Sequence, residues 1–192
     1  DRWLCAMPLY HVGGLSIVMR SCLYGTAIDL RPKFAADEVS DALSSQPITL
    51  VSLVPTMLQR LLDHNPAPNW PHLRLCLLGG AATSGELLAR AQAARVACAT
   101  SYGLTEATSQ VATTLPADAA RKPASVGKPL LFTEVRVINE AGDTQSTGEY
   151  GEIIVRGPTV MRGYLGADDS AANAAKSLRN GWFHTGDIGY LD

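Results

Sequence analysis

The run SYGLTEATSQ at residues 101–110 places three different chemical groups within five positions. Tyr102 has a flat aromatic ring, Thr105 a hydroxyl and Glu106 a carboxylate. Such a ring stacks on a purine, such a hydroxyl donates to a phosphoryl oxygen, and a carboxylate is a hard ligand suited to Mg²⁺. The run follows an apolar strand, and ligands of open α/β sheets bind at the carboxyl ends of strands. In isolation, the segment also fits a surface loop with an N-capping Thr.

Two glycine-containing segments offer further ligand contacts. The strand, Gly pair and helix pattern of LCLLGGAATSGELL at 75–88 would let the backbone approach a ligand and aim free amides at an anion. It is not a GxGxxG motif, and an ordinary βα turn has the same appearance. In GWFHTGDIGYLD at 181–192, Asp187 lies between glycines, where its carboxylate could accept from two neighbouring sugar hydroxyls. TGD also fits a simple β-turn.

Residues 1–115 contain the elements that would position these groups. Short apolar runs such as RWLC, ITLVSLVP, LRLCLLGG and RVACAT alternate with helical patterns, which predicts βαβ units and a largely parallel sheet. For the helix near 85–94, Thr83 or Ser84 is available as the N-cap, and Glu86 supports the positive end of its dipole.

Residues 116–192 have a different pattern. Alternating strands such as EVRVINE and GEIIVRG, separated by turn residues, predict a small antiparallel, β-barrel-like subdomain. A helical insert is expected over 168–178, and residues 116–123 are the expected seam between the two subdomains. The predicted fold class is therefore α/β: a parallel layer followed by antiparallel β structure.

Composition and missing motifs argue against several classes of protein, among them nucleic-acid-binding and membrane-spanning proteins. The 192 residues are 46% hydrophobic and 18% charged with a net charge of −2, and no Lys/Arg cluster suggests a nucleic-acid partner. No apolar run approaches the roughly 18 residues of a membrane span, so a soluble, cytoplasmic protein is expected. The four cysteines have no metal or redox spacing and are expected to be reduced core thiols. HExxH and GxSxG motifs are absent, which argues against metalloprotease and serine-hydrolase chemistry.

Six ordered motifs resemble those of the adenylate-forming enzymes, a family that includes acyl-CoA synthetases, luciferases and nonribosomal adenylation domains. They are PLYHVGG at 8–14, LLGGAA at 77–82, YGLTE at 102–106, SVGKPL at 125–130, GEIIVRGPTVMRGYLG at 151–166 and GWFHTGDIGYLD at 181–192. The finer pattern of PLYHVGGLSIVMRSCLYG and SYGLTEATSQVATT is similar to the subfamily of ligases that act on o-succinylbenzoate in menaquinone synthesis. The resemblance implies carboxylate activation with ATP, Mg²⁺ and coenzyme A.

The resemblance also implies how the nucleoside is held. Tyr102 would stack on the adenine, and Gly80, Ala81 and Ala82 would cover the other face of the base. Asp187 would hold the ribose hydroxyls.

For the reacting groups, the resemblance implies that Thr105 contacts the α-phosphate and Glu106 coordinates Mg²⁺, which makes these two the candidate catalytic residues. His11, Gly80 and Gly103 would border the acyl substrate, although a lone His after a strand also fits a structural role. Arg156 and Tyr164, in the GEIIVRG–RGY region, are expected to be structural.

Family members have a phosphate loop before the PLYH strand and, after TGD, a small domain with a catalytic Lys. We therefore expect the chain to be a fragment that is inactive alone and that self-associates through surfaces the remainder would cover. Alternatives are the same chemistry on a fatty, benzoic or coumaric acid, a silent adenosine-nucleotide-binding module, and a Rossmann oxidoreductase, which lacks its fingerprint here.

Overall fold

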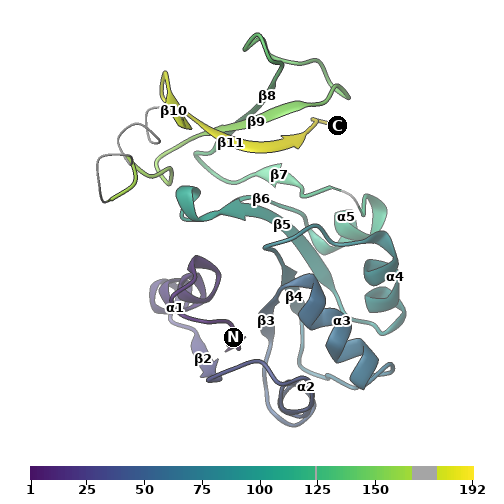
Figure 1. Cartoon of the computed structure of the whole chain (residues 1–192). Helices are drawn as coiled ribbons and strands as arrows, with labels where there is room; N and C mark the ends of the chain where they lie inside the picture. Colours follow the sequence, from purple (N-terminus) through teal and green to yellow (C-terminus); the bar gives the residue numbers. More distant parts are fainter. Residues whose placement is uncertain (124, 166–176) are drawn as a thin grey trace. The chain divides into compact units, whose positions relative to one another are not determined.

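The computed structural model describes residues 1–123, 125–165 and 177–192, and the chain divides into two compact units (Figure 1). The first unit comprises Asp1–Thr105 and Ala112–Lys128, and the second comprises Glu106–Val111 and Pro129–Asp192. From the sequence, a single boundary after residue 115 and a seam over 116–123 are expected. Instead, Pro116–Arg121 form helix α5 of the first unit, with Pro116 in the first turn, where its missing N–H is tolerated.

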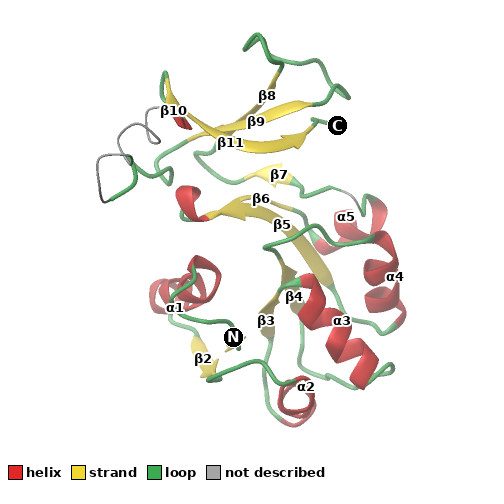
Figure 2. Cartoon of the chain, viewed as in Figure 1, coloured by secondary structure: helices red, strands yellow, loops and turns green. Residues whose placement is uncertain are grey.

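The first unit is built on a parallel sheet, as predicted. Strands β1 (Arg2–Cys5), β2 (Ala27–Leu30), β3 (Leu50–Leu53), β4 (Leu75–Leu78) and β5 (Cys98–Leu104) are parallel neighbours in the order β2-β1-β3-β4-β5 (Figure 2). The sheet order continues with β6 (Ser109–Thr113) and β7 (Lys128–Pro129).

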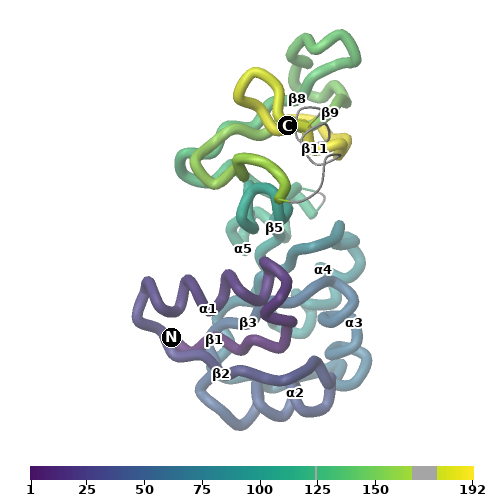
Figure 3. Tube along the Cα trace, turned by 60° about the vertical axis from the view of Figure 1, so that its left-hand side comes forward, coloured from purple at the N-terminus to yellow at the C-terminus, as the bar shows by residue number. Residues whose placement is uncertain are grey.

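Helices cover both faces of this sheet. They are α1 (Val12–Tyr24), α2 (Ala36–Ser45), α3 (Pro55–His64) and α4 (Gly85–Ala93). In the order β2-β1-β3-β4-β5, the chain moves toward one edge of the sheet from β1 to β2. It then moves toward the other edge from β2 through β3 and β4 to β5. Because crossovers between parallel strands are right-handed, α1 must lie on the opposite face from α2, α3 and α4, as Figures 1 and 3 show. Among the helices of the described residues, none has the length and apolar character needed to cross a bilayer.

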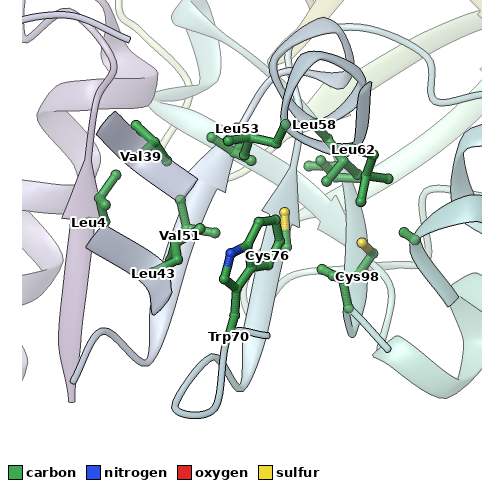
Figure 4. Close-up of a cluster of buried hydrophobic side chains, with 14 of the residues drawn as sticks. Leu4, Val39, Leu43, Val51, Leu53, Leu58, Leu62, Trp70, Cys76 and Cys98 are labelled. Carbon is green, nitrogen blue, oxygen red and sulfur yellow. The ribbon is translucent and has the colours of Figure 1, made fainter. Parts of the chain in front are cut away.

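The main core lies between the sheet and helices α2 to α4. In Figure 4, Leu43 of α2 and Leu58 of α3 face strand residues such as Leu4 and Val51. All four side chains are at most 1% exposed. Burying a side chain of this size stabilises the fold by about 1.5–3 kcal/mol, so this layer holds the sheet on which the candidate site depends.

The four cysteines are free thiols, and three of them are buried core residues, as expected. Cys76 and Cys98 are partners in the register of β4 and β5, and the pKa of the Cys76 thiol is raised by the hydrogen bond with Cys98 and by burial. The expectation is wrong for Cys22, which is exposed because it lies on the outward side of α1.

The second unit contains a four-stranded antiparallel sheet, which confirms the second half of the predicted fold class. Its order is β10 (Leu178–Arg179), β11 (Trp182–Gly189), β9 (Gly151–Arg156) and β8 (Glu134–Ile138). Residues 168–176 of the helical insert expected over 168–178 lie outside the described residues, and Leu178, its last position, begins β10 instead. Asn180 and Gly181 join β10 to β11 with φ of 51° and 80°, the left-handed pair that a two-residue Asn-Gly hairpin needs.

A Trp anchors this sheet. Trp182 is 8% exposed and packs with Ile138 and Ile154, while the guanidinium groups of Arg136 and Arg156 lie 4.5 and 4.6 Å from its ring centroid. Arg156 also donates to Glu134 across the β8–β9 pair at 2.6 Å. These contacts support the structural role expected of Arg156.

Candidate functional site

The first group of candidate residues lies at the carboxyl edge of the parallel sheet. The β4–β5 register ends with Leu78 opposite Thr100, and two residues further along each chain come Gly80 and Tyr102. The loop with Gly80 and the strand end with Tyr102 thus leave the same edge of the sheet from neighbouring strands. In open α/β sheets this edge is where ligands bind.

Close packing explains the two glycines at the end of β4. A Cβ on Gly79 would lie 2.7 Å from Oγ of Ser101, a hydroxyl that donates to the Leu78 carbonyl at 2.9 Å. Gly80 has φ of +79°, which disfavours any residue with a side chain, and a Cβ there would lie 3.3 Å from Cγ1 of Val54. The glycines therefore bring this loop against the neighbouring strand ends.

Helix α4 begins just after this loop. Of the two N-cap candidates, Thr83 and Ser84, it is Ser84 that caps the helix: its hydroxyl accepts from the Leu87 amide at 3.2 Å, and Glu86 lies in the first turn. Ala81 and Ala82, between the glycines and the cap, are exposed. The loop thus presents backbone and small side chains to its surroundings.

Strand β5 is longer than the sequence pattern indicates. It includes Tyr102, Gly103 and Leu104, and a short 3₁₀ helix (Thr105–Ala107) follows directly, so the surface-loop interpretation of this segment is wrong. The Tyr102 side chain is half-buried, whereas Gly103 and Thr105 are exposed. Placement on a strand fixes the backbone beneath the ring more firmly than a loop would.

His11 lies after β1, at the same edge of the sheet, as the N-cap residue of α1. Its side chain makes no capping hydrogen bond and is exposed, with its ring 4.8 Å from the ring of Tyr10 between centroids. Its backbone carbonyl accepts from the Gly14 and Leu15 amides, so the backbone of His11 has a structural role while its imidazole is accessible.

Glu106 belongs to the second unit, where a tyrosine holds its carboxylate. The Tyr164 hydroxyl donates to Oε1 of Glu106 at 2.8 Å, and the Glu106 carbonyl accepts from the Met161 amide at 2.7 Å. The hydrogen bond to Glu106, burial and the negative charge of Glu106 together raise the pKa of Tyr164 above its ordinary value. Sequence reasoning assigned Tyr164 a structural role and missed this contact, which joins residues 58 positions apart.

The backbone after Glu106 is unusual. Thr108 and Ser109 have φ of 55° and 99°, a left-handed pair without glycine, and the Thr108 hydroxyl donates to the Thr159 carbonyl at 2.7 Å. Such backbone persists only where surrounding contacts fix it, and it clusters at ligand sites.

The carboxylate of Glu106 is a hard oxygen donor of the kind that Mg²⁺ takes as a ligand. Within residues 1–123, 125–165 and 177–192, no three His, Cys, Asp or Glu side chains form a group that could hold a metal ion. Mg²⁺ commonly takes one or two carboxylates, substrate phosphates and water, so a single carboxylate is an adequate protein contribution.

Asp187 lies on an enlarged bulge of β11. His184 is paired with Ile154 of β9 and Ile188 with Glu152, so residues 185–187 stand opposite the single residue Ile153. Gly186 has φ of +75° at this irregularity. Because of this bulge, the TGD segment is an irregular part of a strand and not an isolated β-turn. Asp187 is exposed where the ladder of backbone hydrogen bonds is interrupted.

Two side chains replace the backbone pairing that the bulge interrupts. The Thr185 hydroxyl donates to the Ile153 carbonyl at 2.7 Å and accepts from the Asp187 amide at 3.0 Å. The Glu152 carboxylate accepts from the Gly186 amide at 3.1 Å and pairs with Nδ1 of His184 at 2.9 Å. Sequence reasoning did not single out Thr185 or Glu152. The available signal was a carboxylate at the start of the GEIIVRG strand, on the strand that pairs with TGD.

Comparison with known proteins gives a consistent result over the whole chain. Residues 1–165 match the family described as AMP-binding enzyme. The chain is 43% identical over 195 residues to 2-succinylbenzoate–CoA ligase of Bacillus licheniformis, covering 100% of this chain and 39% of that protein.

Solved structures agree with the sequence comparison. The o-succinylbenzoate CoA synthetase of Bacillus subtilis in complex with the acyl-adenylate intermediate OSB-AMP is similar with a TM-score of 0.92 and 36% identity, covering 100% of this chain and 39% of that one. The structure of the Bacillus subtilis synthetase in complex with ATP and magnesium ion gives a TM-score of 0.91 with the same identity and coverage. The chain thus spans about two fifths of the length of these proteins.

Proposed function

The chain belongs to the family of AMP-binding enzymes, and on that premise we propose that the protein containing it is an ATP-dependent acid–CoA ligase acting on 2-succinylbenzoate, the ligase step of menaquinone synthesis. The observation that carries the proposal is the 43% identity to a 2-succinylbenzoate–CoA ligase, in an alignment of 195 residues that covers 100% of this chain. Family membership also removes the Rossmann oxidoreductase alternative.

The proposed reaction has two steps. The substrate carboxylate attacks the α-phosphorus of ATP, forming an acyl-adenylate and releasing pyrophosphate. The thiol of coenzyme A then attacks the acyl carbon, loses its proton and displaces AMP, which leaves the thioester. Adenylation is needed because a carboxylate oxygen is a poor leaving group and AMP is a good one.

We assign the nucleoside contacts to three places. Tyr102 stacks on the adenine, the loop of Gly80, Ala81 and Ala82 covers its other face, and Asp187 accepts from the ribose hydroxyls. The position of Gly80 and Tyr102 at the ends of neighbouring strands supports the first two assignments. The exposure of Asp187 on a braced bulge supports the third.

The phosphate contacts fall to Thr105 and Glu106. Thr105 is exposed directly after β5, at the start of the 3₁₀ helix, and can donate its hydroxyl to an α-phosphate oxygen. Glu106 can hold Mg²⁺ through its carboxylate, and that ion supplies charge stabilisation to the phosphate oxygens when bound. Because Tyr164 occupies one oxygen of Glu106, metal binding would use the other oxygen or displace the phenol.

The acyl substrate is assigned to the region of His11, Gly80 and Gly103, all at the carboxyl edge of the parallel sheet. His11 has an accessible imidazole there, and Gly103 leaves room beside β5 because it has no side chain. These three residues are compatible with 2-succinylbenzoate and with other aromatic or aliphatic acids. The test of the proposal therefore compares several acids.

Acid-dependent exchange of pyrophosphate into ATP tests the proposal on the full-length protein. The panel should contain 2-succinylbenzoate, benzoate, coumarate and a medium-chain fatty acid, and a second assay should follow AMP release with coenzyme A. We expect exchange to be fastest with 2-succinylbenzoate. Preference for another acid would retain the adenylation chemistry and reject the substrate, and nucleotide binding without exchange would indicate a silent module.

A further inference from the structure

The contacts within the second unit point to a residue that acts through Asp187. We propose that Glu152 is a positioning residue for the nucleotide: it holds the bulge of β11 in the one shape that aims the Asp187 carboxylate at the ribose. This inference rests on the proposed ribose role of Asp187. It adds Glu152 as the residue that positions Asp187 for that role.

The bulge of β11 lacks regular backbone pairing with β9. Residues 185–187 stand opposite Ile153 alone, so ladder hydrogen bonds cannot hold all of their backbone groups. A three-residue excursion with a left-handed glycine at its centre has many alternative conformations unless side chains fix it.

Both carboxylate oxygens of Glu152 contact residues of the bulge or next to it. Oε1 accepts from the amide of Gly186, the residue next to Asp187, and Oε2 pairs with Nδ1 of His184, the last regularly paired residue before the bulge. The Glu152 and His184 side chains are 30% and 16% exposed, so these contacts are partly shielded from water. One side chain thereby fixes the start and the centre of the bulge together.

Glu152 differs from a residue that contacts the ligand directly, because its hydrogen bonds are made within the protein. Both of its oxygens have protein donors, and hydrogen bonds to a charged group are stronger than those between neutral groups. Thr185 fixes the other side of the bulge through the Ile153 carbonyl and the Asp187 amide. Glu152 therefore acts on the bulge that carries Asp187, with one protein hydrogen bond on each of its two oxygens.

Calorimetric titration of the full-length protein with AMP and with 2′,3′-dideoxy-AMP, which lacks both ribose hydroxyls, tests this role. We expect Glu152→Ala to weaken AMP binding about tenfold, the effect of losing charge-assisted hydrogen bonds that order a binding group. Binding of dideoxy-AMP should not change. Glu152→Gln should retain near wild-type affinity, because its amide oxygen can accept from Gly186 and its NH₂ can donate to the other tautomer of His184.

A double-mutant comparison gives the second readout. If Glu152 acts only through Asp187, then Glu152→Ala adds no further loss of AMP affinity to Asp187→Ala. Glu140→Ala, an exposed carboxylate of the same unit, is the matched control and should bind AMP normally. If Glu152→Ala does not fold, Glu152→Asp keeps the charge on a shorter side chain and should show the same selective loss at smaller size.

The possible results test the positioning role of Glu152 separately from the ribose role of Asp187. Equal weakening of AMP and dideoxy-AMP, or additive losses in the double variant, would overturn the positioning role and leave the ribose role of Asp187 standing. Wild-type AMP affinity in Asp187→Ala would overturn the ribose assignment together with this inference. Pyrophosphate exchange, measured separately, would still report whether the protein adenylates an acid.

Discussion

Replacing Gly79 by Ala should destabilise the first unit through one identifiable contact. The new Cβ would lie 2.7 Å from Oγ of Ser101, closer than any real contact of this kind. Relief requires either turning the hydroxyl away from the Leu78 carbonyl, which loses a hydrogen bond worth about 1 kcal/mol, or shifting the loop, which costs about 1–3 kcal/mol as overpacking. We expect the free energy of unfolding to fall by about 1–3 kcal/mol.

The sign of this effect should reverse when Ser101 is replaced by Ala. The nearest remaining atom is then the carbonyl oxygen of residue 101, at 4.0 Å, an ordinary distance. Gly79 does not have a positive φ, so Ala in that background should stabilise by about 0.4–1 kcal/mol through the entropy of the unfolded chain.

Urea unfolding of the wild type, the two single variants and the double variant, followed by far-ultraviolet circular dichroism, gives the four free energies. Gly85→Ala is the matched control, because its Cβ would lie 3.6 Å from Pro123 and clash with nothing. If the changes in unfolding free energy of Gly79→Ala and Ser101→Ala add in the double variant, the Gly79 Cβ does not clash with the Ser101 hydroxyl. The explanation of this glycine by close packing against β5 would then be wrong.

Three further predictions follow from single features. Glu106→Ala should lower the adenylation rate of the full-length protein about 100-fold while AMP affinity changes little, and a wild-type rate would exclude Glu106 as the magnesium ligand. Because the folded-state pKa of Tyr164 is raised, its hydroxyl should stabilise the protein below the ordinary tyrosine pKa of about 10 and lose that effect as pH rises through the raised value. Tyr164→Phe should therefore be less stable than wild type at pH 8, and this difference should vanish or invert in strongly alkaline buffer; the same difference at both pH values would contradict the contact with Glu106. The isolated 192-residue chain should self-associate in light scattering, since Met19 and Leu23 of α1 are 56% and 78% exposed, and Leu23→Lys should reduce the association; a strict monomer at high concentration would disprove it.

Local sequence pattern was sufficient for most of the first unit. Apolar runs that alternate with helical patterns predicted β3, β4 and the helix near 85–94. The sequence offered Thr83 or Ser84 as its N-cap, and Ser84 is the one that caps it. The pattern did not predict that β5 continues through Tyr102, because SYGL has no strand periodicity of its own and is extended by its place in the sheet. The exposure of Cys22 likewise depends on which side of α1 faces the sheet.

The candidate residues were chosen from the sequence by residue type, whereas the contacts that support them became visible only in the structure. Tyr102, Glu106 and Asp187 stand out locally as polar groups beside glycines or strand ends. Their supports do not, because Tyr164 reaches Glu106 across 58 positions and Glu152 reaches Gly186 across 34. A bulge is a property of two paired strands, so TGD alone could not distinguish it from a turn.

The central claim is that the protein containing this chain activates 2-succinylbenzoate as its adenylate, and isotope exchange between pyrophosphate and ATP measures that step directly. With the full-length protein, Mg²⁺ and ATP, and without coenzyme A, we expect exchange that requires 2-succinylbenzoate and exceeds the rate with benzoate, coumarate or a fatty acid. Exchange that is absent with every acid, or that proceeds at the same rate without any, would contradict the claim.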